Sequence, residues 1–151
     1  MPYVVAQLAG AIAASVAVRL VTGNTWCPKP EPREWVLGPV LVETLYTTAL
    51  ALVVLYVTTA PATAGNSFYG LAIGFTFGAA AFAGSALSGG AFNPAVGLGP
   101  AIVHAAFGAW NIKHVWIYVV GPCAGGALAA AVFRIQHSPM PSKPTTVPAR
   151  S

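Results

Sequence analysis

Few side chains in this sequence could carry out chemistry, and most of them lie around the stretch SGGAFNPAVGLGP at residues 88–100. Ser85 or Ser88 could act as a nucleophile with His104 as its base, but such a pair needs a third group to orient it and an oxyanion hole. Glu43 is the only further partner that the sequence offers. A loop with turns already explains the serines, so we expect no enzyme activity.

The histidines and cysteines do not have the spacing of a metal site. The two cysteines, Cys27 and Cys123, lie far apart in the sequence and do not suggest a disulfide framework. The three histidines are equally scattered, at His104, His114 and His137. We therefore expect neither a metal nor any other cofactor.

The stretch at residues 88–100 has instead the pattern of a loop that turns back inside a membrane. Asn93 is well suited to the N-cap of a helix, and Pro94 to its first helical position. The apolar residues that follow are too few to cross a bilayer, which takes about 20 residues. The sequence therefore predicts a re-entrant loop and half-helix over residues 88–106.

Such a loop has the chemistry of a pore lining. Its serine and glycines supply irregular backbone whose carbonyls would be bare in lipid, and this is tolerated only where protein or water satisfies them. The N-terminus of a half-helix carries partial positive charge, which attracts the oxygen of a passing neutral molecule and opposes a cation. The residues expected to line the pore are Ser88, Gly89, Gly90, Ala91, Phe92, Asn93, Pro94 and Ala95.

The composition places these residues in a membrane protein. Hydrophobic residues make up 56% of the chain and charged residues only 7%, against roughly 25% charged in a soluble domain. Apolar stretches of spanning length predict four transmembrane helices, at about residues 3–22, 36–58, 66–87 and 114–134. The sequence thus predicts an all-α, multi-pass integral membrane protein. The seven basic residues are scattered singly, so a lipid bilayer and not nucleic acid is the expected partner.

The chain divides into one transmembrane domain, at residues 1–136, and a tail at residues 137–151. The tail is rich in Pro, Ser and Thr and has little to bury, which predicts disorder. Its lysine and arginine weakly favour the cytoplasm. Nothing before the first span resembles a signal peptide.

The first and last spans resemble one another. YVVAQLAGAIAASVAVRL at residues 3–20 aligns without gaps on YVVGPCAGGALAAAVFRI at residues 118–135, with the tyrosine and arginine in register. Apolar helices of low complexity can also match by chance. If the match is a true repeat, the two helices run in opposite directions, as in transporters built from inverted repeats.

The sequence SGGAFNPA, followed by Gly-Pro, resembles the second Asn-Pro-Ala signature of the aquaporin, or major intrinsic protein, family. AQLAGAIAA, VETLYTTALALVVLYVTT, FYGLAIGFTFGAAAFAG and HVWIYVVGPCAGGALAAAVF resemble the family's third to sixth spans. The resemblance implies an aquaporin-like partial fold and a passive channel for water and small neutral solutes. It also implies a homotetramer in which each subunit holds its own pore.

The sequence departs from the family pattern in two ways. Val96 stands where the family usually has an arginine, and Ala81 and Gly90 stand at the other positions of the same selectivity filter, which implies a wider and less polar mouth. The first two spans and the first Asn-Pro-Ala half-helix have no counterpart. The chain is therefore either a channel subunit, with or without a second chain that supplies these spans, or a non-conducting fragment or partner subunit.

Two polar residues within the spans have an expected structural role. The resemblance implies that Glu43 braces the re-entrant loop by accepting its backbone N–H groups, and that Gln7 does the same in the repeat-related half. Gly70, Gly74 and Gly78 recur every fourth residue, which predicts close packing against another helix.

Overall fold

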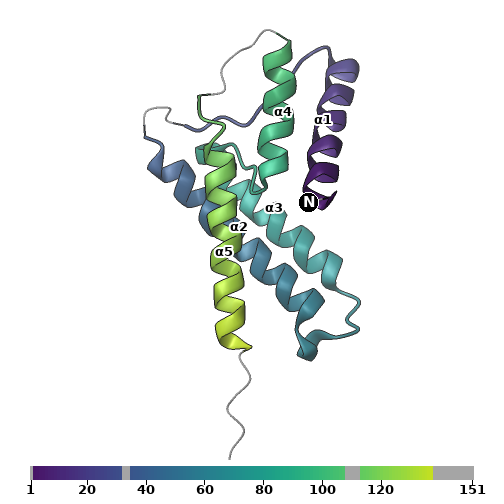
Figure 1. Ribbon diagram of the computed structural model, residues 1–151, viewed down its shortest axis with the longest axis vertical. Coiled ribbons are helices and arrows are strands. Elements are labelled where there is room, and N and C mark those ends of the chain that lie inside the picture. Colours follow the sequence, from purple (N-terminus) through teal and green to yellow (C-terminus); the bar gives the residue numbers. More distant parts are fainter. Residues whose placement is uncertain (1, 32–34, 108–112, 138–151) are drawn as a thin grey trace, which may run out of the picture.

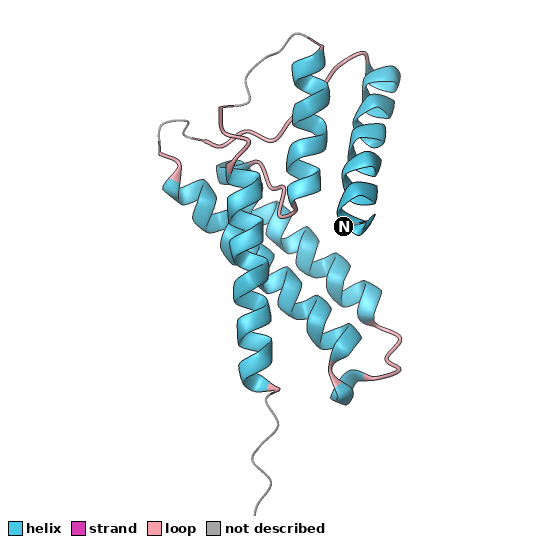
Figure 2. Cartoon of the chain, viewed as in Figure 1, coloured by secondary structure: helices cyan, strands magenta, loops and turns pink. Residues whose placement is uncertain are grey.

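The computed structural model describes residues 2–31, 35–107 and 113–137, which form helices joined by loops, with no strand among them (Figures 1 and 2). The helices are α1 (Pro2–Thr22), α2 (Leu37–Thr59), the short 3-10 helix η1 (Pro61–Thr63), α3 (Tyr69–Ser88), α4 (Pro94–Ala106) and α5 (Ile117–Gln136). Of these, α1, α2, α3 and α5 are long and apolar enough to cross a membrane. The predicted all-α membrane fold, with four spanning helices and one shorter helix, is confirmed for this part of the chain.

One boundary differs from the prediction, because Ser88 is the last residue of α3 and not the first residue of the loop. The backbone leaves the helix at Gly89, whose φ of 90° lies in the left-handed region, and the Gly89 N–H still bonds to the Ser85 carbonyl at 2.9 Å. A glycine in this conformation is a common end for a helix. The irregular backbone therefore runs from Gly89 to Asn93.

Helix α4 begins where the sequence predicted. Asn93 has extended backbone angles, and its side-chain oxygen accepts a hydrogen bond from the Ala95 N–H at 2.9 Å. Pro94 follows in the first turn of the helix, where a missing N–H costs nothing. The helix is 13 residues long, which is too short to cross a bilayer.

The helices form two groups (Figure 1). Helix α2 lies between α3 and α5 and contacts both, whereas α1 contacts α4 and no other helix in the described part of the chain. Helix α4 also contacts α5 and so joins the two groups. In Figure 1, α1 and α4 run in the same direction and α5 runs in the opposite direction, as an inverted relationship between α1 and α5 predicts.

Glycines let α5 and α1 lie close to their neighbours. A Cβ atom at Gly121 of α5 would lie 2.6 Å from the Glu43 Cβ, and one at Gly125 would lie 2.5 Å from the Thr44 carbonyl oxygen. A Cβ at Gly99 of α4 would lie 2.6 Å from the Ala11 Cβ. Larger residues at these positions would push the helices apart.

The predicted role of the glycines spaced four apart on α3 is wrong within the described residues. Nothing lies within 4 Å of the position that a Cβ would take at Gly70, Gly74 or Gly78. The contact between α3 and α2 is made further along, where a Cβ at Gly84 would lie 2.9 Å from a methyl group of Val42. Spacing alone did not show which part of α3 meets its neighbour.

Candidate functional site

The loop between α3 and α4 is held by a buried carboxylate. Glu43 lies on the face of α2 that buries Pro39 and Thr47, and it is fully buried. Its Oε1 accepts hydrogen bonds from the Ser88 hydroxyl at 2.7 Å and the Ala91 N–H at 3.0 Å, and its Oε2 accepts one from the Phe92 N–H at 2.6 Å. Three donors around an acceptor-only group fix the loop to the middle of α2.

The other polar groups of the loop bond mainly to neighbouring side chains. The Gly90 N–H bonds to the Ser88 hydroxyl oxygen at 3.1 Å. The Thr47 hydroxyl donates to the Phe92 carbonyl at 3.2 Å, and the buried Tyr118 hydroxyl of α5 donates to the Ser88 carbonyl. With the Gly89 bond described above, every backbone N–H from Gly89 to Phe92 has a partner.

Three successive carbonyl groups of the loop have none. The carbonyls of Gly89, Gly90 and Ala91 accept no hydrogen bond from any described residue. Ala91 is buried, but Gly89 and Gly90 are partly exposed. Because a bare carbonyl is costly in lipid, the two on partly exposed residues need water or a polar solute beside them. The loop therefore has paired backbone donors from Gly89 to Phe92, and unpaired acceptors on two partly exposed residues.

Phe92 is the strained residue of the loop, and nothing in the sequence indicated this strain. Its φ of 48° lies in the left-handed region, which a phenylalanine rarely adopts and which costs about 1–3 kcal/mol. Both its backbone groups are bonded, and its buried ring makes edge contacts with the rings of Tyr46 and Phe77, at centroid distances of 5.6 and 6.3 Å. These contacts hold the backbone turn that places Asn93 at the start of α4.

Asn93 presents a donor at the N-terminus of α4. Its Oδ1 caps the helix, while its Nδ2 makes no hydrogen bond within the described residues. The free amide group lies at the end of α4 that carries partial positive charge. This end of the helix can therefore donate to an oxygen but offers nothing to a cation.

A cavity of about 260 Å³ lies beside Val96, between α1 and α4. Its lining is almost entirely apolar: Ala11, Ala14, Ser15, Val18, Thr25, Trp26, Val96, Pro100 and Val103. The three expected filter positions, Ala81, Gly90 and Val96, are all partly exposed, but neither Ala81 nor Gly90 lines this cavity. Of the three expected filter positions, the structure thus places only Val96 in it.

A second, more polar cavity of about 470 Å³ adjoins the loop. It is lined by Thr25, Trp26, Cys27, Lys29, Glu31, Ser85, Gly89 and His104. Thr25 and Trp26 line both cavities. No residue from Thr25 to Glu31 was among the expected site residues, so the sequence analysis did not predict this cavity.

Burial also sets the chemistry of one group in this second cavity. Burial raises the pKa of the Cys27 thiol above its usual value, and the nearby Lys29 ammonium partly opposes that rise. A raised pKa keeps the thiol protonated at neutral pH and slows its reaction with alkylating reagents.

Neither Ser85 nor Ser88 forms a hydrogen bond with His104 within the described residues. The Ser88 hydroxyl donates to Glu43, and the His104 Nδ1 lies 2.7 Å from the Thr25 hydroxyl. Ser85 lines the same cavity as His104 but makes no hydrogen bond with it. The two residues expected to brace the loop differ. The Glu43 side chain accepts three hydrogen bonds, whereas the Gln7 side chain is exposed on α1 and makes none within the described chain.

Comparison with known proteins shows to which family this chain is similar. The family model described as major intrinsic protein matches residues 1–133. A probable TIP-type aquaporin of Medicago truncatula is 35% identical over 136 residues, which cover 88% of this chain and 52% of that protein. The probable aquaporin TIP3-2 of Oryza sativa subsp. japonica is 32% identical over 98% of the chain and 55% of its own length. Aquaporin TIP1-1 of Arabidopsis thaliana is 33% identical over 88% of the chain and 52% of its own length.

The chain spans about half the length of these relatives. The family model nevertheless matches most of the chain, and the four apolar helices are of the length that a multi-pass integral membrane protein requires. The chain belongs to the major intrinsic protein family.

Proposed function

We propose that this chain forms part of a passive channel for water and small neutral solutes. Its path runs along the partly exposed residues of the loop from Ser88 to Ala95, which are Gly89, Gly90, Asn93, Pro94 and Ala95. One observation carries the proposal: the carbonyls of Gly89 and Gly90, on two partly exposed residues, have no partner among the described residues, while every backbone N–H from Gly89 to Phe92 has one. Such a row of acceptors stabilises a file of water molecules. Passive conduction through it needs no catalytic group or cofactor.

The electrostatics of the loop favour neutral solutes. The N-terminus of α4 and the free Asn93 amide attract oxygen atoms and oppose cations. The Val96 side chain has neither charge nor donor, and the cavity beside it is almost entirely apolar. We infer weak selectivity among neutral molecules. The family resemblance extends this proposal to a homotetramer in which every subunit holds a pore.

A second candidate function is a non-conducting fragment or partner subunit. It is favoured by the packing of α1, which buries no residue and contacts only α4 in the described part of the chain. A closed pore needs walls on all sides, so further helices from another chain would have to cover α1 and the start of α4. In that case this chain conducts only within a mixed assembly.

The proposal is tested by stopped-flow osmotic shrinkage of proteoliposomes that contain the chain, beside empty vesicles. The Asn93→Asp variant keeps the capping oxygen and replaces the free donor with a charged acceptor, so it should abolish the water flux. Asn24→Asp makes the same change in an exposed loop and should leave the flux intact. If proteoliposomes that contain folded protein shrink no faster than empty vesicles, the result contradicts the proposal and favours the partner subunit.

A further inference from the structure

Two adjoining cavities of opposite character lie beside Thr25 and Trp26. The first, between α1 and α4, has a volume of about 260 Å³ and an almost entirely apolar lining. The second has a volume of about 470 Å³ and a lining that includes the polar side chains of Lys29, Ser85 and His104. Because Thr25 and Trp26 line both, the two cavities meet at these residues. Such a pair suits an amphiphile, which has a polar head and an apolar chain.

The apolar cavity is open to the surrounding bilayer. Ala14 and Val18 of α1 line this cavity and are exposed, and α1 buries none of its residues. Since α1 is long and apolar enough to cross a membrane, its exposed side chains meet the acyl chains of the lipid. The apolar chain of an amphiphile can therefore enter from the bilayer, between α1 and α4.

The volume of the apolar cavity admits only a short chain. A methylene group takes up about as much space as a water molecule, roughly 30 Å³, so 260 Å³ holds one chain of about eight carbons. The two long acyl chains of a phospholipid do not fit this volume. The cavity therefore favours an amphiphile with a single chain of medium length.

The polar cavity favours an anionic head. The Lys29 ammonium group makes no ion pair with any described residue, whereas Glu31, the acidic residue of the lining, already has an interaction partner. The Ser85 hydroxyl is also unpaired among the described residues, and His104 uses one ring nitrogen, its Nδ1, to contact the Thr25 hydroxyl at 2.7 Å. A carboxylate in this cavity would thus meet an ammonium group and a hydroxyl that can both donate to it.

We propose that the paired cavities form a binding site for medium-chain fatty acids, with the carboxylate at Lys29 and the hydrocarbon chain between α1 and α4, beside Val96. Under the proposed function, water passes Val96, so a bound fatty acid also blocks conduction. This consequence rests on the proposed function, but binding itself does not. The two are therefore measured separately.

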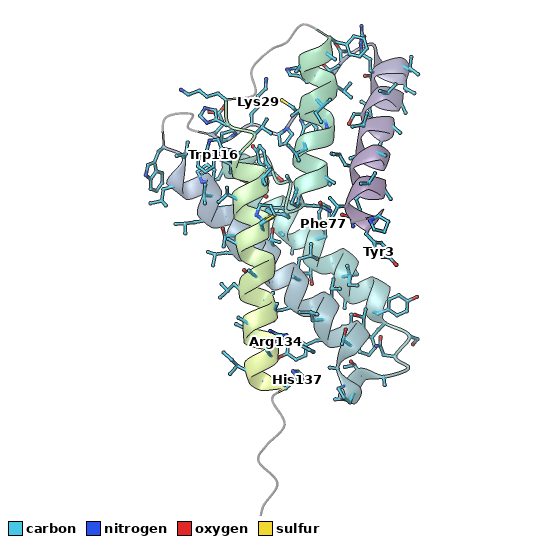
Figure 3. All side chains as sticks on the ribbon, in the orientation of Figure 1. Tyr3, Lys29, Phe77, Trp116, Arg134 and His137 are labelled. Atoms are coloured by element: carbon cyan, nitrogen blue, oxygen red, sulfur yellow. The ribbon has the colours of Figure 1, made fainter. Side chains whose placement is uncertain are left out.

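Binding is measured by titrating the full chain in lipid nanodiscs with octanoate, with the histidine rings isotope-labelled for NMR. The His104 signal, assigned from its loss in His104→Phe, should shift and saturate. His137 is the internal control, because it lies at the end of the molecule opposite Lys29 (Figure 3) and bonds to the Phe133 carbonyl. Shifts that are absent, or equal and unsaturated at both histidines, would overturn the proposal.

The role of the head is tested by removing one charge from the protein or from the ligand. Lys29→Gln should weaken the binding of octanoate by roughly two- to tenfold, as expected for the loss of one exposed charged hydrogen bond. Lys113→Gln, at an exposed lysine outside both cavities, is the matched control and should leave the affinity unchanged. The neutral octanamide should bind the unsubstituted chain and Lys29→Gln equally. Equal octanoate affinities for the two lysine variants would overturn the assignment of the carboxylate to Lys29.

The role of the apolar cavity is tested with a series of chain lengths. Each methylene buried in an apolar site should tighten binding by roughly fourfold, and the gain should level off near eight carbons, where the cavity is full. A gain that continues evenly from hexanoate to dodecanoate would indicate partition into the bilayer and would overturn the proposal.

Blockage is measured as osmotic shrinkage of proteoliposomes with and without octanoate, beside empty vesicles. Octanoate should slow the shrinkage over the concentrations that saturate the His104 signal, and Lys29→Gln should need more octanoate for the same effect. Saturable binding with unchanged shrinkage would overturn the blockage. A chain that does not conduct even without octanoate contradicts the proposed function, and the titration then decides the binding site alone.

Discussion

Glu43 and Phe92 lie 49 positions apart in sequence, and a carboxylate oxygen of Glu43 accepts the backbone N–H of Phe92 at 2.6 Å. The bond joins the middle of a spanning helix to the residue that directly precedes the half-helix cap. It therefore transmits the position of α2 to the N-terminus of α4, which is the part of the loop that we propose to face the solute.

Glu43→Gln should destabilise the fold and lower the water flux. The glutamine amide places an NH₂ group where the carboxylate accepted an N–H, so one buried donor loses its partner at a cost of about 1–3 kcal/mol. Thermal unfolding in detergent, followed by circular dichroism, measures the change. A melting temperature equal to that of the unsubstituted chain would show that the bonds to Glu43 contribute little.

Phe92→Gly should be more stable than Phe92→Ala, although both remove the ring. Alanine keeps a Cβ in the left-handed region at φ 48°, whereas glycine adopts this region freely, and the difference should be about 1 kcal/mol. Comparing the melting temperatures of the two variants in the same detergent tests the strain directly. An alanine variant as stable as the glycine variant would mean that the backbone relaxes when the ring is lost.

Gly97→Ala should destabilise the contact between α4 and α5. Its Cβ would lie 2.3 Å from the Cβ of the buried Tyr118, and overpacking of this kind costs about 1–3 kcal/mol. Gly126→Ala on α5 is the control, because nothing lies within 4 Å of its Cβ position. The melting temperature should fall for Gly97→Ala and stay level or rise for Gly126→Ala.

Alkylation of Cys27 should be slow at neutral pH. Its rate should begin to rise only at a higher pH than the alkylation rate of an ordinary thiol does. Burial raises the pKa of Cys27, so the reactive thiolate is scarcer in the folded chain than in the unfolded chain at the same pH. The rate of maleimide labelling of a Cys123→Ser variant, measured against pH, tests this. Unfolded protein is the control, and coincident pH profiles for the two states would contradict the shift.

The sequence predicted those features that depend on local pattern. The apolar stretches indicated four spanning helices, and Asn93 with Pro94 indicated the start of α4, because a cap depends on residues two or three positions away. Each of these features follows from neighbours in the chain. The end of α3 was predicted one residue too early, because the structure keeps Ser88 in the helix.

The features that were missed depend on contacts between distant residues. The positive φ of Phe92 is imposed by partners on α2 and α3, and nothing in the residue type indicates it. The bonds from Tyr118 to Ser88 and from Thr25 to His104 depend on how whole helices sit against one another. For the same reason, the glycine spacing at Gly70, Gly74 and Gly78 did not predict which part of α3 contacts α2.

The most direct test of the conduction path is reversible thiol blockage at Val96. A Val96→Cys substitution, in a chain with serine at positions 27 and 123, places the single thiol in the cavity between α1 and α4. The path that we propose predicts that a methanethiosulfonate reagent stops osmotic shrinkage of the proteoliposomes and that a reductant restores it. Complete labelling with no change in the shrinkage rate would show that water does not pass this residue.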